Sequence, residues 1–170
     1  MKTFNYHVAK DSKEASKLSS SSSAFLAGGM TSIPSVKLGL ATYKDIIDIK
    51  HIKKLSGIKV SGKSVTIGAT TKHADVANSK EIKKAIPSLA KLAGGIGDAQ
   101  VRNRGTVGGS IANNDPSACY PSACMALNAI IHTNDRKIEA SKFFRGMFET
   151  ALKKGELIEA VEFQIPEKSN

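Results

Sequence analysis

The 170-residue chain contains no tryptophan, and its two cysteines, Cys119 and Cys124, are too few for a disulfide framework. The cysteines do not form a CxxC pair, and the four histidines show no HxxxH or HExxH spacing, so no metal site is expected. The longest nearly apolar run, residues 123–131, is interrupted by Asn128 and is shorter than the ~20 residues of a membrane span. We therefore do not expect a disulfide scaffold, a zinc protein or a membrane-spanning protein.

The N-terminal sequence MKTFNYHVAKD has no apolar segment of the kind found in secretory signal peptides. No internal repeat is evident along the chain. We interpret the cysteines as buried free thiols in a reducing compartment, and we expect a cytoplasmic protein.

The chain is strongly basic, because 25 lysines and arginines against 15 aspartates and glutamates give a net charge of +10. Such a charge fits either a lysine-rich surface or an anionic partner such as a nucleic acid. The lysines are scattered as single residues and pairs, and few aromatic side chains are available to stack on bases. The pattern favours a lysine-rich surface, with a basic nucleic-acid-binding protein as the less favoured alternative.

Hydrophobic residues at 41% and charged residues at 24% are ordinary for one globular domain. The clearest element is a hairpin of residues 58–60 and 65–67, in which apolar and polar residues alternate. Residues 97–121 show little periodicity and are expected to be rich in loops. Strands and helices mix without strict alternation, which predicts an α+β fold, with two small lobes. The other expected strands cover residues 24–27, 36–40, 45–49, 129–132 and 157–165. Helices are expected from residue 11 to a serine run at 19–23, over 70–78, over 80–93 with a break at Pro87, and over 123–129.

Two glycine-rich segments carry the candidate chemistry, Ala27–Ser32 (AGGMTS) and Thr106–Ser110 (TVGGS). Paired glycines allow close approach of the backbone, and successive N–H groups in such turns can bind an anion. Flanking hydroxyl groups can add hydrogen bonds to phosphate or ribityl oxygens. Two such segments fit a long ligand with a central pyrophosphate, although the glycines alone also fit ordinary tight turns.

Longer motifs favour the ligand. The run GDAQVRNRGTVGGSIANNDP (residues 97–116), together with AGGMTS, IGATTKHAD (67–75) and FFRGMFETAL (143–152), resembles one family over nearly the whole chain. This family is the FAD-binding medium subunit of molybdenum hydroxylases, which include aerobic carbon monoxide dehydrogenase and xanthine dehydrogenase. The carbon monoxide dehydrogenase type, a separate flavoprotein subunit, is the most similar.

The resemblance implies a two-lobed PCMH-type FAD-binding domain, with a small α/β lobe over residues 1–56 and an antiparallel-sheet lobe over residues 57–170. It implies an oxidoreductase subunit that passes electrons from a partner [2Fe–2S] small subunit through FAD to a quinone or NAD. A molybdopterin large subunit would oxidise the substrate, so no catalytic side chain is expected here. Relatives continue beyond the stretch that matches Pro166, and we therefore expect the family's C-terminal domain to be absent.

The resemblance also assigns cofactor contacts. Ala27–Ser32 would hold the pyrophosphate, Thr106–Ser110 would contact the pyrophosphate and ribityl region, Ile96 would lie beside the flavin, and Leu157 would pack near the ring or the adenine. Two positions depart from the family: Met30 replaces a common His or Gln, and Cys119 replaces a common Asp that binds the cofactor in relatives. The complete set of predicted contacts is Ala27, Gly28, Gly29, Met30, Thr31, Ser32, Ile96, Thr106, Val107, Gly108, Gly109, Ser110, Asp115, Cys119 and Leu157.

Some of the residues near these segments could have a structural role instead of binding the cofactor. Asp115 could cap the turn before Pro116, and Arg102 and Arg104 could either bind phosphate or orient the loop through backbone carbonyls. A thiol is a weak hydrogen-bond partner, so Cys119 suggests a second hypothesis. In that hypothesis the chain keeps the flavin fold but serves as a flavin-free assembly or interaction module of the same complex.

Overall fold

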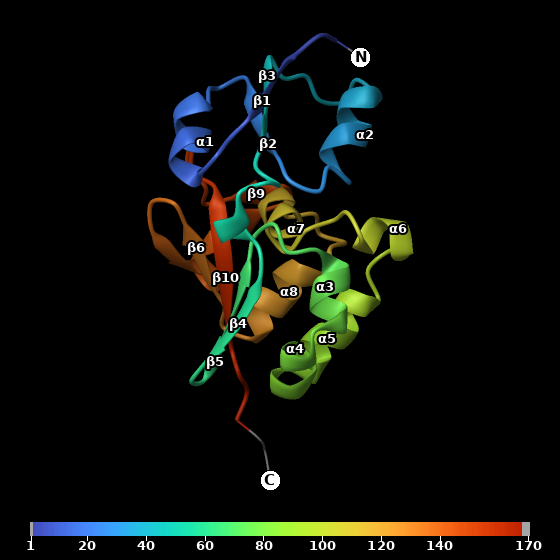
Figure 1. The fold of residues 1–170 in the computed structure, drawn as a ribbon, viewed down its shortest axis with the longest axis vertical. Helices are drawn as coiled ribbons and strands as arrows, with labels where there is room; N and C mark the ends of the chain where they lie inside the picture. Colours follow the sequence, from blue (N-terminus) through green and yellow to red (C-terminus); the bar gives the residue numbers. More distant parts are fainter. Residues whose placement is uncertain (1, 168–170) are drawn as a thin grey trace.

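The structure, a computed structural model, describes residues 2–167, which form two lobes around two main sheets (Figure 1). In the first lobe, three parallel strands lie in the order β1–β3–β2. Helices α1 and α2 lie on opposite sides of this sheet (Figure 1). The elements of this lobe are β1 (Asn5–Val8), α1 (Ser12–Leu18), β2 (Ser23–Leu26), α2 (Ser32–Lys37) and β3 (Asp45–Asp48), followed by the short 3-10 helix η1 (Lys53–Leu55).

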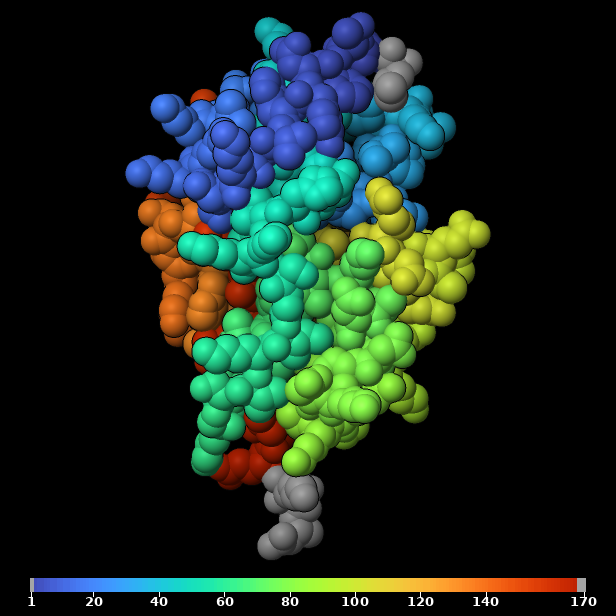
Figure 2. Space-filling model, in the orientation of Figure 1, coloured from blue at the N-terminus to red at the C-terminus, as the bar shows by residue number. Residues whose placement is uncertain are grey.

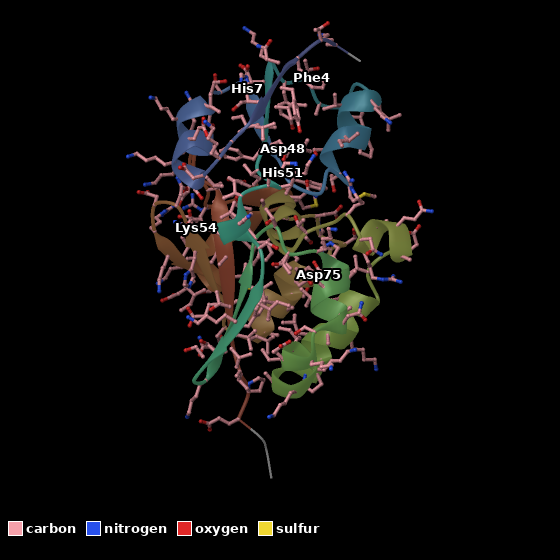
Figure 3. The ribbon with its side chains drawn as sticks, viewed as in Figure 1. Phe4, His7, Asp48, His51, Lys54 and Asp75 are labelled. Atoms are coloured by element: carbon pink, nitrogen blue, oxygen red, sulfur yellow. The ribbon has the colours of Figure 1, made fainter. Side chains whose placement is uncertain are left out.

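Because the strands of the first lobe are parallel, their carboxyl ends lie at one edge of the sheet. Figure 3 places Phe4 and His7 toward the outer end of this lobe, and Asp48 and His51 toward the end that faces the second lobe. The loop between β2 and α2, which contains AGGMTS, starts from this inner edge. Ligands of parallel sheets characteristically bind at the carboxyl ends of the strands, so the topology puts the glycine pair where a ligand can be held.

The second lobe is built on a five-stranded antiparallel sheet in the order β4–β5–β10–β6–β7. Helices cover one face of this sheet (Figure 1). A small two-stranded sheet, β8–β9, completes the lobe. The elements are β4 (Ile58–Ser61), β5 (Ser64–Gly68), α3 (His73–Asn78), α4 (Lys80–Ala85), α5 (Pro87–Gly94), α6 (Ala99–Arg102), α7 (Val107–Asn113), α8 (Cys119–Ala126), β6 (Ile130–Thr133), β7 (Lys137–Glu139), α9 (Ala140–Phe143), β8 (Phe144–Gly146), β9 (Glu149–Thr150) and β10 (Ile158–Gln164).

Each lobe has its own apolar core. In the first lobe, Ile47 of the central strand is fully buried against residues that include Ala15 of α1. In the second lobe, alternate residues of the sheet, such as Ile67, Val161 and Phe163, pack against the covering helices. Leu157, which directly precedes β10 of the second lobe in sequence, packs into the core of the first lobe.

The predicted α+β, two-lobed architecture is confirmed. The predicted hairpin is β4–β5, and Val65 and Ile67 face the core, as their alternation with polar residues indicates. Pro87 restarts a helix as predicted, because α5 begins at this residue, where the missing N–H of proline costs no hydrogen bond. The proposed lobe boundary after residue 56 stays a prediction.

The prediction of a strand over residues 36–40 is wrong. Residues up to Lys37 belong to α2, and the residues after it are not in a strand. Pro34 stands in the first turn of this helix, which tolerates proline. Val36 is buried while Leu38 and Leu40 are 74% and 79% exposed, so the apparent alternation does not mark one buried face.

The prediction of an irregular segment over residues 97–121 is also wrong in part, because α6, α7 and the start of α8 lie within it. These helices are short and rich in small residues, so they show no apolar periodicity. Their capping residues were the available signal: Asp98 accepts a hydrogen bond from the N–H of Val101 (2.8 Å), and Thr106 accepts one from Gly109 (3.2 Å).

Within residues 2–167, no helix has both the length and the apolar character needed to cross a bilayer. The same part of the chain contains no cluster of three or more metal-ligating side chains.

Candidate functional site

The first glycine segment forms an open loop with free hydrogen-bond donors. Among the described residues, the backbone N–H groups of residues 28–32 have no acceptor. The N-cap of α2, Thr31, makes no capping hydrogen bond through its side chain. Gly29 has a φ of 75°, which only glycine adopts without strain. The loop thus presents a row of N–H groups, together with the hydroxyl groups of Thr31 and Ser32, to any anion at the edge of the sheet.

This loop lies directly against the second lobe. A Cβ atom on Gly28 would lie 2.1 Å from the carbonyl oxygen of Arg104 and 3.0 Å from Cα of Gly105. Figure 2 shows the same junction from outside, where the light-blue segment around residue 30 borders the yellow segment around residue 100. Gly28 is therefore required for close packing between the lobes, and the fold brings the two glycine-rich segments of the sequence together.

The second glycine segment has a different local structure. Thr106 is the N-cap of α7, and the helix begins at Val107. The N–H groups of Val107 and Gly108 donate to the carbonyl oxygens of Thr71 (3.0 Å) and Ala69 (2.8 Å), and those of Gly109 and Ser110 donate to Thr106. These N–H groups are not free to form the anion-binding turn that the paired glycines suggested.

Instead, Gly108 allows α7 to pack closely on the end of β5. A Cβ atom at this position would lie 2.5 Å from Cβ of Ala69. Thr106, Val107 and Gly108 are buried, whereas Gly109 is exposed and Ser110 is half-buried. Of this segment, only Gly109 and Ser110 therefore present surface to a ligand.

A buried aromatic pair, His73 and Tyr120, packs against the glycine that follows Arg104. A Cβ atom on Gly105 would lie 2.7 Å from Nε2 of His73, so this glycine packs on the imidazole. The His73 ring lies 5.3 Å from the ring of Tyr120. Burial lowers the pKa of His73 to about 4 and raises the pKa of Tyr120. The Nδ1 atom of His73, the hydroxyl of Tyr120 and Oγ1 of Thr70 are buried without a partner among the described residues.

The two arginines near the junction have different roles. Arg102 donates through Nη1 to the carbonyl oxygens of Ile96 (3.0 Å) and Gly97 (2.8 Å), so its side chain orients the preceding loop. Ile96, half-buried, packs at the margin of the core of the second lobe. The side chain of Arg104 is exposed and makes no hydrogen bond or ion pair with another described residue.

The remaining predicted contacts are more scattered. Asp115 accepts hydrogen bonds through Oδ1 from the N–H (2.9 Å) and the hydroxyl (2.7 Å) of Ser117, which is the turn-capping role, and these bonds lower its pKa. Cys119, the first residue of α8, is exposed, so the interpretation of both cysteines as buried thiols is wrong for this residue and holds for Cys124. Met30 is 38% exposed in the first loop, but Leu157 is only 3% exposed and presents almost no surface.

Two buried polar groups were missed by the sequence analysis. The carboxylate of Asp48 is fully buried at the carboxyl end of the central strand, where it accepts hydrogen bonds from the hydroxyl of Tyr6 and the backbone N–H of Lys50 and pairs with the ammonium of Lys50 (2.8 Å). Burial acts to raise the pKa of Asp48, but the bonds from Lys50 and Tyr6 outweigh burial and lower it. The signal was an aspartate enclosed by isoleucines in IIDIK.

The second missed group is Glu156, which is 6% exposed. It binds Arg136 through both oxygens (Nε–Oε1 2.9 Å, Nη2–Oε2 3.1 Å) and also accepts hydrogen bonds from Thr133 and from the N–H of Lys153. This network fixes the residue before Leu157, and so it fixes the side chain that enters the core of the first lobe.

The described residues fit the diphosphate of a dinucleotide. Free N–H groups of residues 28–32 are suitable donors to phosphate oxygens, and the backbone of Arg104 lies against Gly28.

Comparison with known proteins agrees with this geometry. Residues 2–167 match the family model "FAD binding domain in molybdopterin dehydrogenase". The chain is 38% identical to the carbon monoxide dehydrogenase medium chain of Hydrogenophaga pseudoflava, with 96% of this chain and 58% of the relative covered. It is 36% identical to the glyceraldehyde dehydrogenase medium chain of Sulfolobus acidocaldarius, with 95% and 60% covered.

A solved structure of carbon monoxide dehydrogenase from Hydrogenophaga pseudoflava, in a form that lacks the Mo-pyranopterin moiety of the molybdenum cofactor, superimposes with a TM-score of 0.94 at 35% identity. This comparison covers 98% of our chain and 60% of the solved chain. The chain thus spans about three fifths of the length of the relatives that it matches. By sequence and by structure, it belongs to the family of FAD-binding domains of molybdopterin dehydrogenases.

Proposed function

We propose that this chain is the FAD-binding part of the medium subunit of a molybdenum hydroxylase, and that it passes electrons from a partner [2Fe–2S] subunit to an external acceptor. The observation that carries the proposal is the row of free N–H groups at residues 28–32, placed at the carboxyl edge of a parallel sheet and against the second lobe. Membership of the family names the cofactor as FAD.

In this proposal the chain binds and orients, and it does not act as an acid or base. Residues 27–32 hold the diphosphate, with Gly109 and Ser110 contributing from the second lobe. Ile96, Asp115 and Cys119 would border the site. Thr106, Val107, Gly108 and Leu157 are buried and would support its walls through packing. When bound, FAD supplies the redox chemistry, and the protein supplies its position and electrostatic surroundings.

The rest of the system is proposed from the relatives, several of which are medium chains of dehydrogenases. A molybdopterin large subunit would oxidise the substrate, and a small subunit with [2Fe–2S] clusters would deliver electrons to the flavin. The acceptor would be a quinone or NAD, and the complex would be cytoplasmic.

The experiment is a flavin titration of the purified 170-residue chain. We expect bound FAD at a ratio near one per chain, measured by flavin absorbance after gel filtration. A chain that stays colourless after incubation with FAD contradicts the proposal. If that colourless chain still forms a complex with the [2Fe–2S] and molybdopterin subunits, it is the flavin-free assembly module that Cys119 suggested.

The electron-transfer step has its own test. The chain is mixed with its partner subunits and the organic substrate without an acceptor, and bleaching of the flavin absorbance is followed. Bleaching that requires the [2Fe–2S] subunit supports the proposed route. Equally fast bleaching without this subunit contradicts it.

A further inference from the structure

We propose that Arg104 is the cation that the second lobe supplies to the diphosphate of FAD. The inference rests on the proposed function, and it decides between the two roles that the sequence left open for Arg104. The two lobes meet where the carbonyl group of Arg104 lies against Gly28. Arg104 is therefore adjacent to the loop whose N–H groups have no acceptor among the described residues.

The backbone of Arg104 is held firmly, so its side chain starts from a defined place. The N–H groups of Arg104 and Gly105 donate to the carbonyl oxygen of Val101 (3.1 and 2.7 Å), and the carbonyl oxygen of Gly105 accepts from His73 (3.1 Å). A fixed backbone limits the entropy lost when a flexible side chain is ordered on a ligand.

Two of the other cations near this junction are already engaged. Arg102 is bound to the carbonyl oxygens of Ile96 and Gly97, and the ammonium of Lys50 lies 2.8 Å from the buried carboxylate of Asp48. Within residues 2–167, the guanidinium of Arg104 has no carboxylate within 4.0 Å and no hydrogen-bond acceptor. It can therefore offer its whole charge to a ligand.

The chemistry of the two groups matches. A diphosphate presents several anionic oxygens, and a planar guanidinium can donate two parallel hydrogen bonds to such a group. The N–H groups of the first lobe and the guanidinium of the second would then bind one diphosphate from two sides. FAD binding would consequently also hold the two lobes together.

The test compares FAD affinity, measured by quenching of flavin fluorescence, in the wild-type chain, Arg104→Gln and Arg104→Lys. We expect Arg104→Gln to weaken FAD binding about tenfold, which is a typical value for loss of a charge-assisted hydrogen bond. Arg104→Lys should recover part of the loss, because it keeps the charge but not the planar fork. Arg145→Gln is the matched control, since Arg145 is another exposed arginine in the second lobe and should bind FAD as the wild type does.

Salt separates a charge contact from a structural role. Raising sodium chloride from about 0.1 M to about 1 M shortens the Debye length from ~10 Å to ~3 Å, and should weaken FAD binding more in the wild type than in Arg104→Gln. Equal affinity of Arg104→Gln and wild type, or equal salt dependence, overturns the role of Arg104 while leaving FAD binding established. Failure of the wild-type chain to bind FAD overturns both this inference and the proposed function.

Discussion

The contact between Gly28 and the second lobe allows a quantitative prediction for Gly28→Ala. The added Cβ would lie 2.1 Å from the carbonyl oxygen of Arg104 and 2.8 Å from its carbonyl carbon. A normal contact requires about 3.2 Å or more, so the loop and Arg104 must separate by about 1 Å. Neither side yields easily, because the clashing atoms belong to the backbone and that of Gly105 is fixed by hydrogen bonds to Val101 and His73.

Overpacking of this kind costs about 1–3 kcal/mol, and we expect a value near the upper end for Gly28→Ala. The free energy of unfolding is measured by urea denaturation with circular dichroism. FAD affinity should also fall, by about 10- to 100-fold, because displacement of the loop moves the N–H groups of residues 28–32.

The matched control is Gly94→Ala. This glycine ends α5, and a Cβ atom there would meet only Cβ of Ala77 at 3.8 Å, an ordinary contact. We expect unchanged FAD affinity and unchanged or slightly higher stability, because alanine is the better helix former. If Gly28→Ala unfolds at the same urea concentration as the wild type and binds FAD equally well, the close contact between the lobes is refuted.

Three further changes test buried polar groups. Burial acts to raise the pKa of Glu156, but hydrogen bonds from Arg136 outweigh burial and lower the pKa from 4.5 to about 2. Ionised Glu156 should therefore contribute about 3 kcal/mol to the free energy of unfolding above pH 4.5, and this contribution should be lost as the pH falls toward 2. Glu156→Gln should flatten this part of the curve of stability against pH. Burial lowers the pKa of His73 from 6.5 to about 4, so the unfolded chain takes up a proton at a higher pH than the folded chain does. The free energy of unfolding should therefore fall by up to about 3 kcal/mol between pH 6.5 and pH 4. If His73→Phe loses stability over this range as steeply as the wild type, His73 is not the cause of the loss. Asp48→Asn should lower the free energy of unfolding, measured in urea, by about 1–3 kcal/mol, because the hydroxyl of Tyr6 and the ammonium of Lys50 lose a buried charged partner. An unchanged unfolding midpoint would show that the buried carboxylate contributes nothing to stability.

The hairpin and the helix start at Pro87 could be predicted because each depends on local chemistry. Alternation places Val65 and Ile67 on one face of any extended segment, and a proline fits the first turn of any helix. The prediction of a strand at residues 36–40 was wrong because burial there depends on tertiary contacts and not on local alternation. Leu38 and Leu40 are apolar but exposed, and short-range alternation cannot show which side of a residue meets a core.

The candidate site was predictable in its parts but not in its assembly. The AGGMTS segment could be recognised as a loop that exposes N–H groups, because paired glycines leave the backbone free. The TVGGS segment looked equivalent, yet its N–H groups are used by Thr71, Ala69 and Thr106. Two of these three residues lie more than thirty positions away in the sequence, so no local pattern could reveal that the donors are occupied.

The sequence by itself therefore determined the family and the α+β class and named candidate residues for a diphosphate, because these depend on residue type and short spacing. Only the tertiary structure decided which of those residues are free to bind. It separates Arg102, whose side chain holds a loop, from Arg104, whose side chain has no partner among residues 2–167 and whose carbonyl group lies against Gly28. The physical reason is that hydrogen bonds and close contacts are exclusive: a donor that is satisfied inside the protein is lost to a ligand, and only the folded chain brings the competing partners together.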